Sequence, residues 1–317
     1  MLFIVCEIRT PVRTPDTDGP AQAHQLVLRG ASSWQSGDHA AARDLCMQAL
    51  QHAPQSCEAL LLLGFMALDS GSPEESIDWI SQAISVNKEM ENAHYLLGQS
   101  QQATGQYDAA ILSYTEALRL KPDYAEALND RGNAWRRLGR ADLALSSYDV
   151  AVQLRPGNGL FHNNRGVALR ELARLDEAIS ALQEAIALNS SDGMAHFNLG
   201  LALFGVGRYT QALASHDEAA RLLSNDPQAR CARADTLRVL GQYDASLRDY
   251  DEALAMAPGR AEIHNNRGIL LLFWGRLDEA LAGFDAAIRL DPDHADAWCN
   301  RGMTLEACGR QRPALAC

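Results

Sequence analysis

The sequence predicts an all-α fold, an α-solenoid of antiparallel helix pairs, on three regularities that share one period. Glycine recurs at intervals that are multiples of 34, with Ala234 in the one missing slot: Gly30, Gly64, Gly98, Gly132, Gly166, Gly200, Gly268 and Gly302. Nineteen residues after each slot stands an alanine: Ala49, Ala83, Ala117, Ala151, Ala185, Ala219, Ala253 and Ala287. Further glycines and prolines recur with the same period of 34 residues. Self-similarity at such a period is the signature of repeat architectures.

Each repeat is predicted to be helix, turn, helix when the recurring glycine is numbered position 8. Small residues at positions 8, 20 and 27 allow two helix backbones to approach, and a large residue at position 24 fills the space beside them. The turn carries glycines suited to positive φ: Gly37, Gly71, Gly105, Gly139, Gly207, Gly241, Gly275 and Gly309. Prolines then end the second helix, because proline cannot continue one: Pro54, Pro122, Pro156, Pro258 and Pro292.

The repeats divide the chain into an N-terminal extension and a solenoid. Residues 1–22 precede the first repeat and are expected to be poorly ordered, and residues 23–317 form the solenoid. Eight full repeats begin at residues 23, 57, 91, 125, 159, 193, 227 and 261, and a truncated ninth begins at residue 295. Because solenoids normally end in a complete polar cap, the ninth repeat suggests a truncated gene, a fragment or the front of a longer protein.

The pattern at positions 8, 20, 24, 27 and 32 resembles the tetratricopeptide repeat, and residues 162–186 (HNNRGVALRELARLDEAISALQEAI) match it closely. The resemblance covers residues 23–317 and implies a right-handed superhelix whose inner surface is lined by the first helix of each pair. Position 4, often tryptophan in the family, departs from it: only Trp298 complies, and the others include His94, His162, His196 and His264. We interpret these histidines as flat, partly polar fillers between helices.

Composition argues against several partners. The net charge of −12 disfavours nucleic acid, whose binding relies on clustered Lys and Arg. No run approaches the roughly 20 apolar residues of a membrane span. The seven cysteines form no CxxC pair, so neither zinc nor a disulfide framework is expected, and a reducing cytoplasm is the predicted compartment.

No catalytic or cofactor-binding residue is predicted. The sequence contains no HExxH motif, phosphate-binding glycine loop or G-x-S-x-G elbow. The repeats leave only 22 residues for anything else, so the chain itself is predicted not to be an enzyme and to need no cofactor or metal.

The concave groove is predicted to bind a peptide through polar residues at positions 5, 6, 9 and 12 of the first helices. They are Asn129, Asn133, Asn163, Asn164, Asn198, Asn265, Asn266, Asn300, Arg136 and Arg170. An asparagine amide both donates and accepts, so it can pair with the backbone of an extended peptide. Asn164, Asn198, Asn266 and Asn300 resemble the asparagine ladder in the repeat arm of the O-linked N-acetylglucosamine transferases. Alternatively the asparagines only solvate the groove, and the arginines pair with acidic residues of neighbouring repeats.

The N-terminal repeats are apolar at the corresponding positions. The residues are Leu28, Leu61, Leu62, Phe65, Tyr95 and Leu96. An exposed apolar patch usually marks an interface. Three interpretations remain open: a binding or self-association surface, a surface covered by residues 1–22, or a different register in the first repeat.

The predicted function is a non-catalytic scaffold that binds an extended or helical segment of another protein in its groove. The alternative is the substrate-recognition arm of a glycosyltransferase-like enzyme whose catalytic domain lies beyond residue 317.

Overall fold

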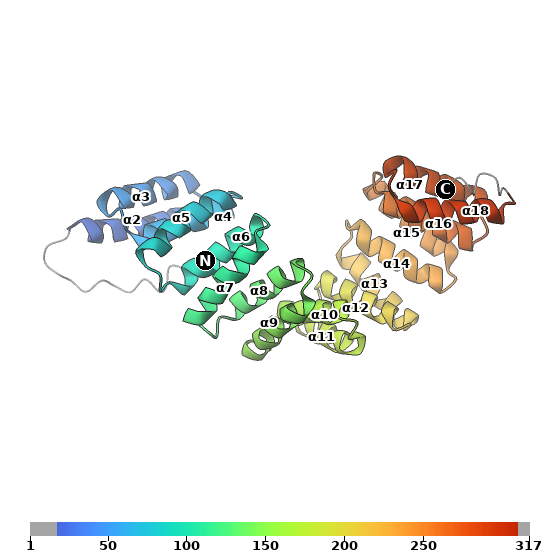
Figure 1. The fold of residues 1–317 in the computed structure, drawn as a ribbon, viewed down its shortest axis with the longest axis horizontal. Helices are drawn as coiled ribbons and strands as arrows, with labels where there is room; N and C mark the ends of the chain where they lie inside the picture. Colours follow the sequence, from blue (N-terminus) through green and yellow to red (C-terminus); the bar gives the residue numbers. More distant parts are fainter. Residues whose placement is uncertain (1–17, 310–317) are drawn as a thin grey trace. The chain divides into compact units, whose positions relative to one another are not determined.

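The computed structural model describes residues 18–309, which form seventeen helices joined by short turns and, within that range, no strand (Figure 1). The helices that open the repeats, called first helices here, are α2 (Asp18–Gln35), α4 (Cys57–Asp69), α6 (Glu91–Ala103), α8 (Ala125–Arg137), α10 (Gly159–Glu171), α12 (Gly193–Gly205), α14 (Pro227–Val239), α16 (Ala261–Phe273) and α18 (Ala295–Ala307). The second helices are α3 (His39–His52), α5 (Pro73–Val86), α7 (Tyr107–Leu120), α9 (Ala141–Leu154), α11 (Leu175–Leu188), α13 (Tyr209–Leu222), α15 (Tyr243–Met256) and α17 (Leu277–Leu290). The prediction of an all-α fold of helix pairs is confirmed.

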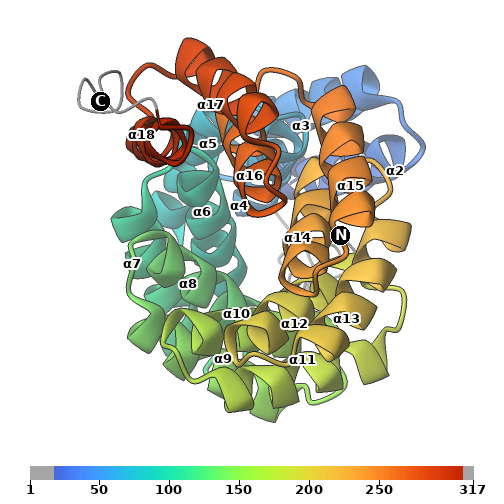
Figure 2. The same ribbon diagram turned by 90° about the vertical axis from the view of Figure 1, so that its right-hand side faces the viewer.

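The helices form two compact units, residues 1–156 (unit 1) and residues 157–317 (unit 2), which are described separately. Within each unit a second helix packs against the first helix that precedes it and against the next first helix of the same unit, and successive first helices also touch, as α4 touches α6 and α12 touches α14. Each unit is therefore a layer of first helices beside a layer of second helices, as α12 and α14 beside α13 and α15 illustrate (Figure 2).

The seam inside each helix pair has the predicted close approach. A Cβ atom built on Gly98, Gly132 or Gly268 would lie 2.6 Å from the aromatic ring at position 24 of the same repeat. Those rings, Tyr114, Tyr148 and Phe284, are fully buried. The small residue at position 8 is therefore required by its neighbour, which confirms the small and large pattern read from the sequence.

The turns between the paired helices use the predicted glycines, whose φ angles lie between 70° and 86°. One repeat departs from this rule, because Ala173 occupies the same position with a φ of 58°. Left-handed backbone costs an alanine about 1–2 kcal/mol, whereas glycine adopts it freely. The turn between α10 and α11 is thus the strained one among the turns described.

Replacing Ala173 with glycine is expected to stabilise unit 2 by about 1 kcal/mol, because it removes this strain. The mirror change is Gly207→Ala in the next turn, where nothing lies within 4 Å of a built Cβ and φ is 76°. Gly207→Ala should destabilise unit 2 by a similar amount. Urea unfolding of the two variants measures both effects. A loss of stability in Ala173→Gly would show that Ala173 is not strained.

Three of the four position-4 histidines make the same contact as the tryptophan of the ninth repeat. Nε2 of His94, His196 and His264 lies 2.9–3.1 Å from the backbone carbonyl oxygen six residues earlier, and Trp298 Nε1 donates to the equivalent carbonyl of Pro292 at 2.9 Å. Because a carbonyl only accepts, Nε2 of each ring carries the proton. These side chains link the first helix of their repeats to the loop that precedes it, and their ring N–H groups are used in that bond.

The solenoid begins earlier than the predicted residue 23. Helix α2 starts at Asp18 and is 18 residues long, whereas the other first helices are 13 residues long. Five residues of the expected N-terminal extension are therefore helical. Residues 1–17 and the predicted second helix of the ninth repeat, residues 310–317, lie outside the described residues.

Candidate functional site on the first helices

Successive first helices meet through one recurring pair of positions. The residue at position 5 of one repeat faces the residue at position 6 of the next, 35 residues further on. Tyr95 donates to Asp130 at 2.8 Å, Asn198 donates to Asn163 at 3.0 Å and Asn300 donates to Asn265 at 2.9 Å. We call these the inter-repeat pairs, and their chemistry sets the character of the first-helix face.

In unit 2 the asparagines belong to the contact between successive first helices, called the repeat joint here. Asn163, Asn164, Asn198 and Asn265 are buried, and Asn266 and Asn300 are half-buried. Within α10, Asn163 donates to Asn164 at 3.5 Å, and within α16, Asn265 donates to Asn266 at 3.3 Å. Much of the amide hydrogen-bonding capacity expected to serve a peptide is therefore used within and between the first helices.

Removing one of these amides is expected to cost stability as well as any binding. Asn198→Ala should destabilise unit 2 by about 1–3 kcal/mol, because it leaves buried Asn163 Oδ1 without its donor. In the double variant Asn163→Ala, Asn198→Ala the orphaned group is gone, so the two losses should be less than additive. Additive losses in denaturant unfolding would show that the pair does not couple.

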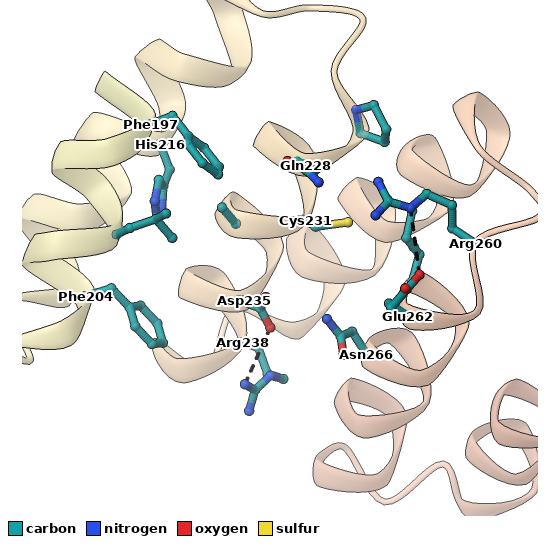
Figure 3. Close-up of a pocket in the computed structure, with 14 residues that line it drawn as sticks. Phe197, Phe204, His216, Gln228, Cys231, Asp235, Arg238, Arg260, Glu262 and Asn266 are labelled. Carbon is teal, nitrogen blue, oxygen red and sulfur yellow. Dashed lines mark ion pairs between the residues drawn. The ribbon is translucent and has the colours of Figure 1, made fainter. Parts of the chain in front are cut away.

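The pattern is broken in the middle of unit 2. The inter-repeat pair of α12 and α14 is Phe197 with Ala232, and that of α14 and α16 is Cys231 with Asn266. Because Ala232 is too small to fill the space beside its neighbours, a cavity of about 370 Å³ opens on the first-helix face here. Phe197 and Phe204 of α12 lie along one wall of it (Figure 3), and Leu201 of the same helix also lines it. We call this cavity the α14 pocket.

The polar groups of the α14 pocket are largely compensated. Tyr250 Oη donates to Asp235 Oδ1 at 2.7 Å, and Arg238 Nη2 lies 3.6 Å from the same oxygen. Arg260 Nε lies 3.8 Å from Glu262. Burial raises the pKa of the Asp235 carboxyl, and the Tyr250 hydrogen bond and Arg238 oppose that shift.

The reactive side chains of the pocket are held neutral. Burial raises the pKa of the Cys231 thiol to about 12, so it is protonated at neutral pH and a poor nucleophile. Burial also lowers the pKa of His216 to about 4. Among residues 18–309 no group of three His, Cys, Asp or Glu side chains is placed to hold a metal ion.

In unit 1 the predicted residues Asn129 and Asn133 belong to a polar cluster around Asp130. The Asp130 carboxylate accepts hydrogen bonds from Tyr95 and Gln99 on α6 and from both asparagines on α8, at 2.8–3.4 Å. Burial raises its pKa, and these four donors counteract the rise. Tyr95 is therefore a hydrogen-bond donor inside the repeat joint. Arg136, like Arg170 of unit 2, is half-buried at the end of its first helix.

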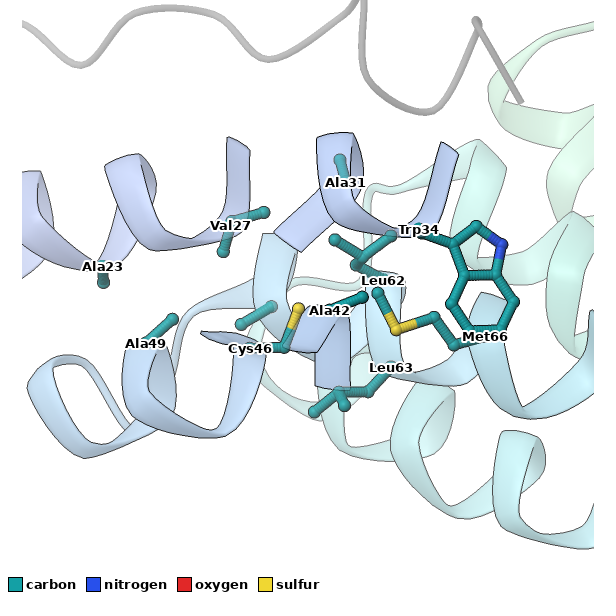
Figure 4. Packing of buried hydrophobic residues seen from close by; sticks show 11 residues of the cluster. Ala23, Val27, Ala31, Trp34, Ala42, Cys46, Ala49, Leu62, Leu63 and Met66 are labelled. Atoms are coloured by element: carbon teal, nitrogen blue, oxygen red, sulfur yellow. The ribbon is translucent and has the colours of Figure 1, made fainter. Parts of the chain in front are cut away.

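The apolar patch expected in the N-terminal repeats is mostly core. Leu61, Leu62 and Leu96 are only 4–7% exposed, so the expectation that they face solvent is wrong. They occupy inter-repeat positions. Leu62 clusters with Val27 of the preceding repeat (Figure 4). Leu96 clusters with Leu61. Phe65 and Tyr95 are half-buried. Leu28 alone is exposed, at 40%, and it has no preceding repeat among the described residues.

The α14 pocket was not predicted, although its signal is in the sequence. Positions 5 and 6 of the C-terminal repeats are mainly asparagine, and Phe197, Cys231 and Ala232 interrupt that run. Knowledge that position 5 faces position 6 of the next repeat is needed to see that a large and a small residue are paired there.

None of the described helices is long and apolar enough to span a bilayer.

The fold and this face define a helical-repeat scaffold. A family model described as the tetratricopeptide repeat matches residues 27–89, 95–159, 163–228 and 231–293, and a second tetratricopeptide model matches residues 284–315. The chain belongs to the tetratricopeptide repeat family. Proteins with this repeat serve as scaffolds for protein–protein interaction. No curated protein matches the chain by sequence.

Solved structures share the fold at low identity. The Cut9–Hcn1 hetero-tetramer of the APC/C matches with a TM-score of 0.66 and 17% identity over 83% of this chain and 52% of that one. This chain thus spans about half the length of that relative. A tetratricopeptide repeat protein from Parabacteroides merdae matches with a TM-score of 0.63 and 19% identity, over 79% and 99% of the two chains. PilF of Pseudomonas aeruginosa matches with a TM-score of 0.57 and 24% identity, over 65% and 94%.

Proposed function

We propose that the chain is a non-catalytic scaffold that binds a segment of another protein along the first-helix face of unit 2, anchored in the α14 pocket. The observation that carries this proposal is the pocket itself, an open apolar cavity on a face where the inter-repeat pairs of α10 with α12 and of α16 with α18 are asparagine pairs. Concave, mostly apolar cavities with a few polar groups are the usual form of a binding site.

Exposed apolar side chains occur on the helices that line the pocket. Met194 on α12 is 45% exposed, and Phe273 on α16 is 65% exposed. The Arg238 guanidinium lies 5.3 Å from the centre of the Phe273 ring, which positions that ring beside the pocket. Covering apolar surface is worth about 25 cal/mol per Å², so a segment that fills the pocket and covers these residues gains binding energy.

The asparagines contribute less to this proposal than the sequence led us to expect. Their amides bond to one another across the repeat joints, so they support the stacking of the repeats. The same observation gives no additional support to the glycosyltransferase arm, which rested on those residues. Self-association through the N-terminal repeats likewise loses its basis, because Leu61, Leu62 and Leu96 are buried.

The test is selection of displayed random peptides against the full chain, followed by affinity measurement on two matched variants. Ala232→Leu fills the pocket and should reduce peptide affinity at least tenfold. Leucine is tolerated at position 6, as Leu62 and Leu96 show. Ala214→Leu makes the same change at an exposed site on second helix α13 and should leave affinity unchanged. Equal affinity for the parent and Ala232→Leu would refute the pocket as the anchor.

A further inference from the structure

The acceptor capacity of Asp235 is only partly used. Its Oδ1 receives the Tyr250 hydroxyl at 2.7 Å and faces Arg238 at 3.6 Å, while Oδ2 accepts no hydrogen bond from any described residue. Because Oδ2 is not among the polar atoms that are fully covered and unpartnered, it is at least partly accessible, and Asp235 lines the pocket. A carboxylate accepts about four hydrogen bonds, and a polar atom in an apolar site is stabilised by a donor. The pocket therefore presents an acceptor to whatever enters it.

The walls suit a flat ring. The lining includes the half-buried side chains of Phe197, Leu201 and Phe204 on α12 and the buried Ile263 on α16. Figure 3 shows Phe197 and Phe204 on the α12 side of the pocket. An aromatic side chain buries roughly 150–250 Å² and packs edge to face against other rings. The cavity of about 370 Å³ has room for such a side chain.

Charge argues against a cationic occupant. Asp235 is close to Arg238, and Glu262 is close to Arg260, so the two acids and two bases of the pocket balance. A lysine or arginine entering the pocket would be desolvated among apolar walls and would meet both guanidinium groups. A neutral donor meets neither cost.

On the basis of the proposed function, we infer that the α14 pocket takes an aromatic side chain bearing a hydrogen-bond donor, tryptophan or tyrosine, whose N–H or O–H group donates to Asp235. The inference narrows the partner to a segment with such a residue at its anchor position. It also assigns Asp235 as the residue that distinguishes a tryptophan or tyrosine from a phenylalanine or leucine.

Side-chain analogues test the inference without knowledge of the partner. The probes are 3-methylindole, which donates but does not accept, 3-methylindene, in which CH₂ replaces N–H, and n-butylammonium, which mimics lysine. Binding to the full chain is followed through the NMR amide shifts of Ala232 and Asp235. We expect 3-methylindole to bind about tenfold more tightly than 3-methylindene, the effect of one hydrogen bond to a charged group, and Ala232→Leu to abolish both.

The decisive variant is Asp235→Asn. It should fold, because Asn133 occupies the same repeat position and accepts the Tyr148 hydroxyl at 2.7 Å. If the amide oxygen of the new asparagine accepts the Tyr250 hydroxyl, as Asn133 accepts that of Tyr148, its NH₂ group takes the place of Oδ2. An NH₂ group only donates, so it cannot accept a hydrogen bond from the indole N–H. The tenfold preference should disappear.

Three outcomes overturn the inference. They are equal binding of 3-methylindole and 3-methylindene by the parent, a preference for 3-methylindole that persists in Asp235→Asn, and tighter binding of n-butylammonium than of 3-methylindole by the parent. In each case, a selected peptide that still depends on Ala232 would leave the proposed function standing. Loss of that dependence would refute the proposed function separately.

Discussion

Replacing Gly268 with leucine is expected to lower the free energy of unfolding of unit 2 by about 3 kcal/mol, through overpacking of the seam between α16 and α17. A Cβ atom at Gly268 would already lie 2.6 Å from Cε1 of Phe284, whose ring is fully buried. One methyl group is accommodated at this position elsewhere, because Ala234 stands opposite Tyr250. The three further carbons of leucine would force the helix backbones apart.

The matched control is Gly259→Leu, in the loop before the same helix pair. Nothing lies within 4 Å of a Cβ built there, and its φ is not in the left-handed region. Its cost should be below about 0.5 kcal/mol, the usual range for surface changes. Urea unfolding of both variants decides the matter. Similar midpoints for the two would mean that position 8 is not a close-packed contact.

Acidification from pH 7 to pH 5 is expected to destabilise unit 2 by about 2 kcal/mol through His216 alone. Burial lowers the pKa of this imidazole from about 6.5 to about 4, so the unfolded chain binds a proton that the folded unit does not. The His216 contribution is therefore complete above pH 6.5, declines as the pH falls from 6.5 to 4, and is constant below that. Thr236 Oγ1, 2.9 Å from Nδ1, already donates to the Ala232 carbonyl, so Nδ1 carries the proton.

The variant His216→Phe isolates this effect. Phe284 fills the same position in another repeat, so the ring is compatible with the seam. Nε2 of His216 is buried without a hydrogen-bond partner, because the residue at position 9 of its repeat is the apolar Leu201. The variant should be at least as stable as the parent at pH 7 and clearly more stable at pH 5. A difference in unfolding free energy that stays constant from pH 7 to pH 5 would contradict the assignment.

Predictions from the sequence were accurate where a residue's role is local to its own repeat. The close approach of Gly132 to Tyr148, the positive φ of the turn glycines and the ends of the helices all follow from contacts within 34 residues of chain. Ala173 is the informative exception, since an alanine in a glycine position marks the turn that is strained. The first repeat was less well predicted, because α2 extends five residues beyond the repeat frame.

Predictions for the binding face were less accurate, because exposure there depends on the neighbouring repeat. Leu28 and Leu62 share position 6, yet Leu28 is 40% exposed and Leu62 is 6% exposed. Leu62 packs with Val27 of the repeat before it, and no described repeat precedes Leu28. A face assigned from helical spacing within one helix does not contain that information.

By itself, the sequence of this protein determined the repeat period, the helix pairs and the family, because small and large residues 16 positions apart in a repeat must meet in the seam. The tertiary structure decided which residues of the first helices remain available to a partner. The spacing of consecutive first helices brings position 5 against position 6 of the next repeat, so asparagine meets asparagine in the joints. Phe197 meets Ala232, and the volume that this pair leaves unfilled is the α14 pocket.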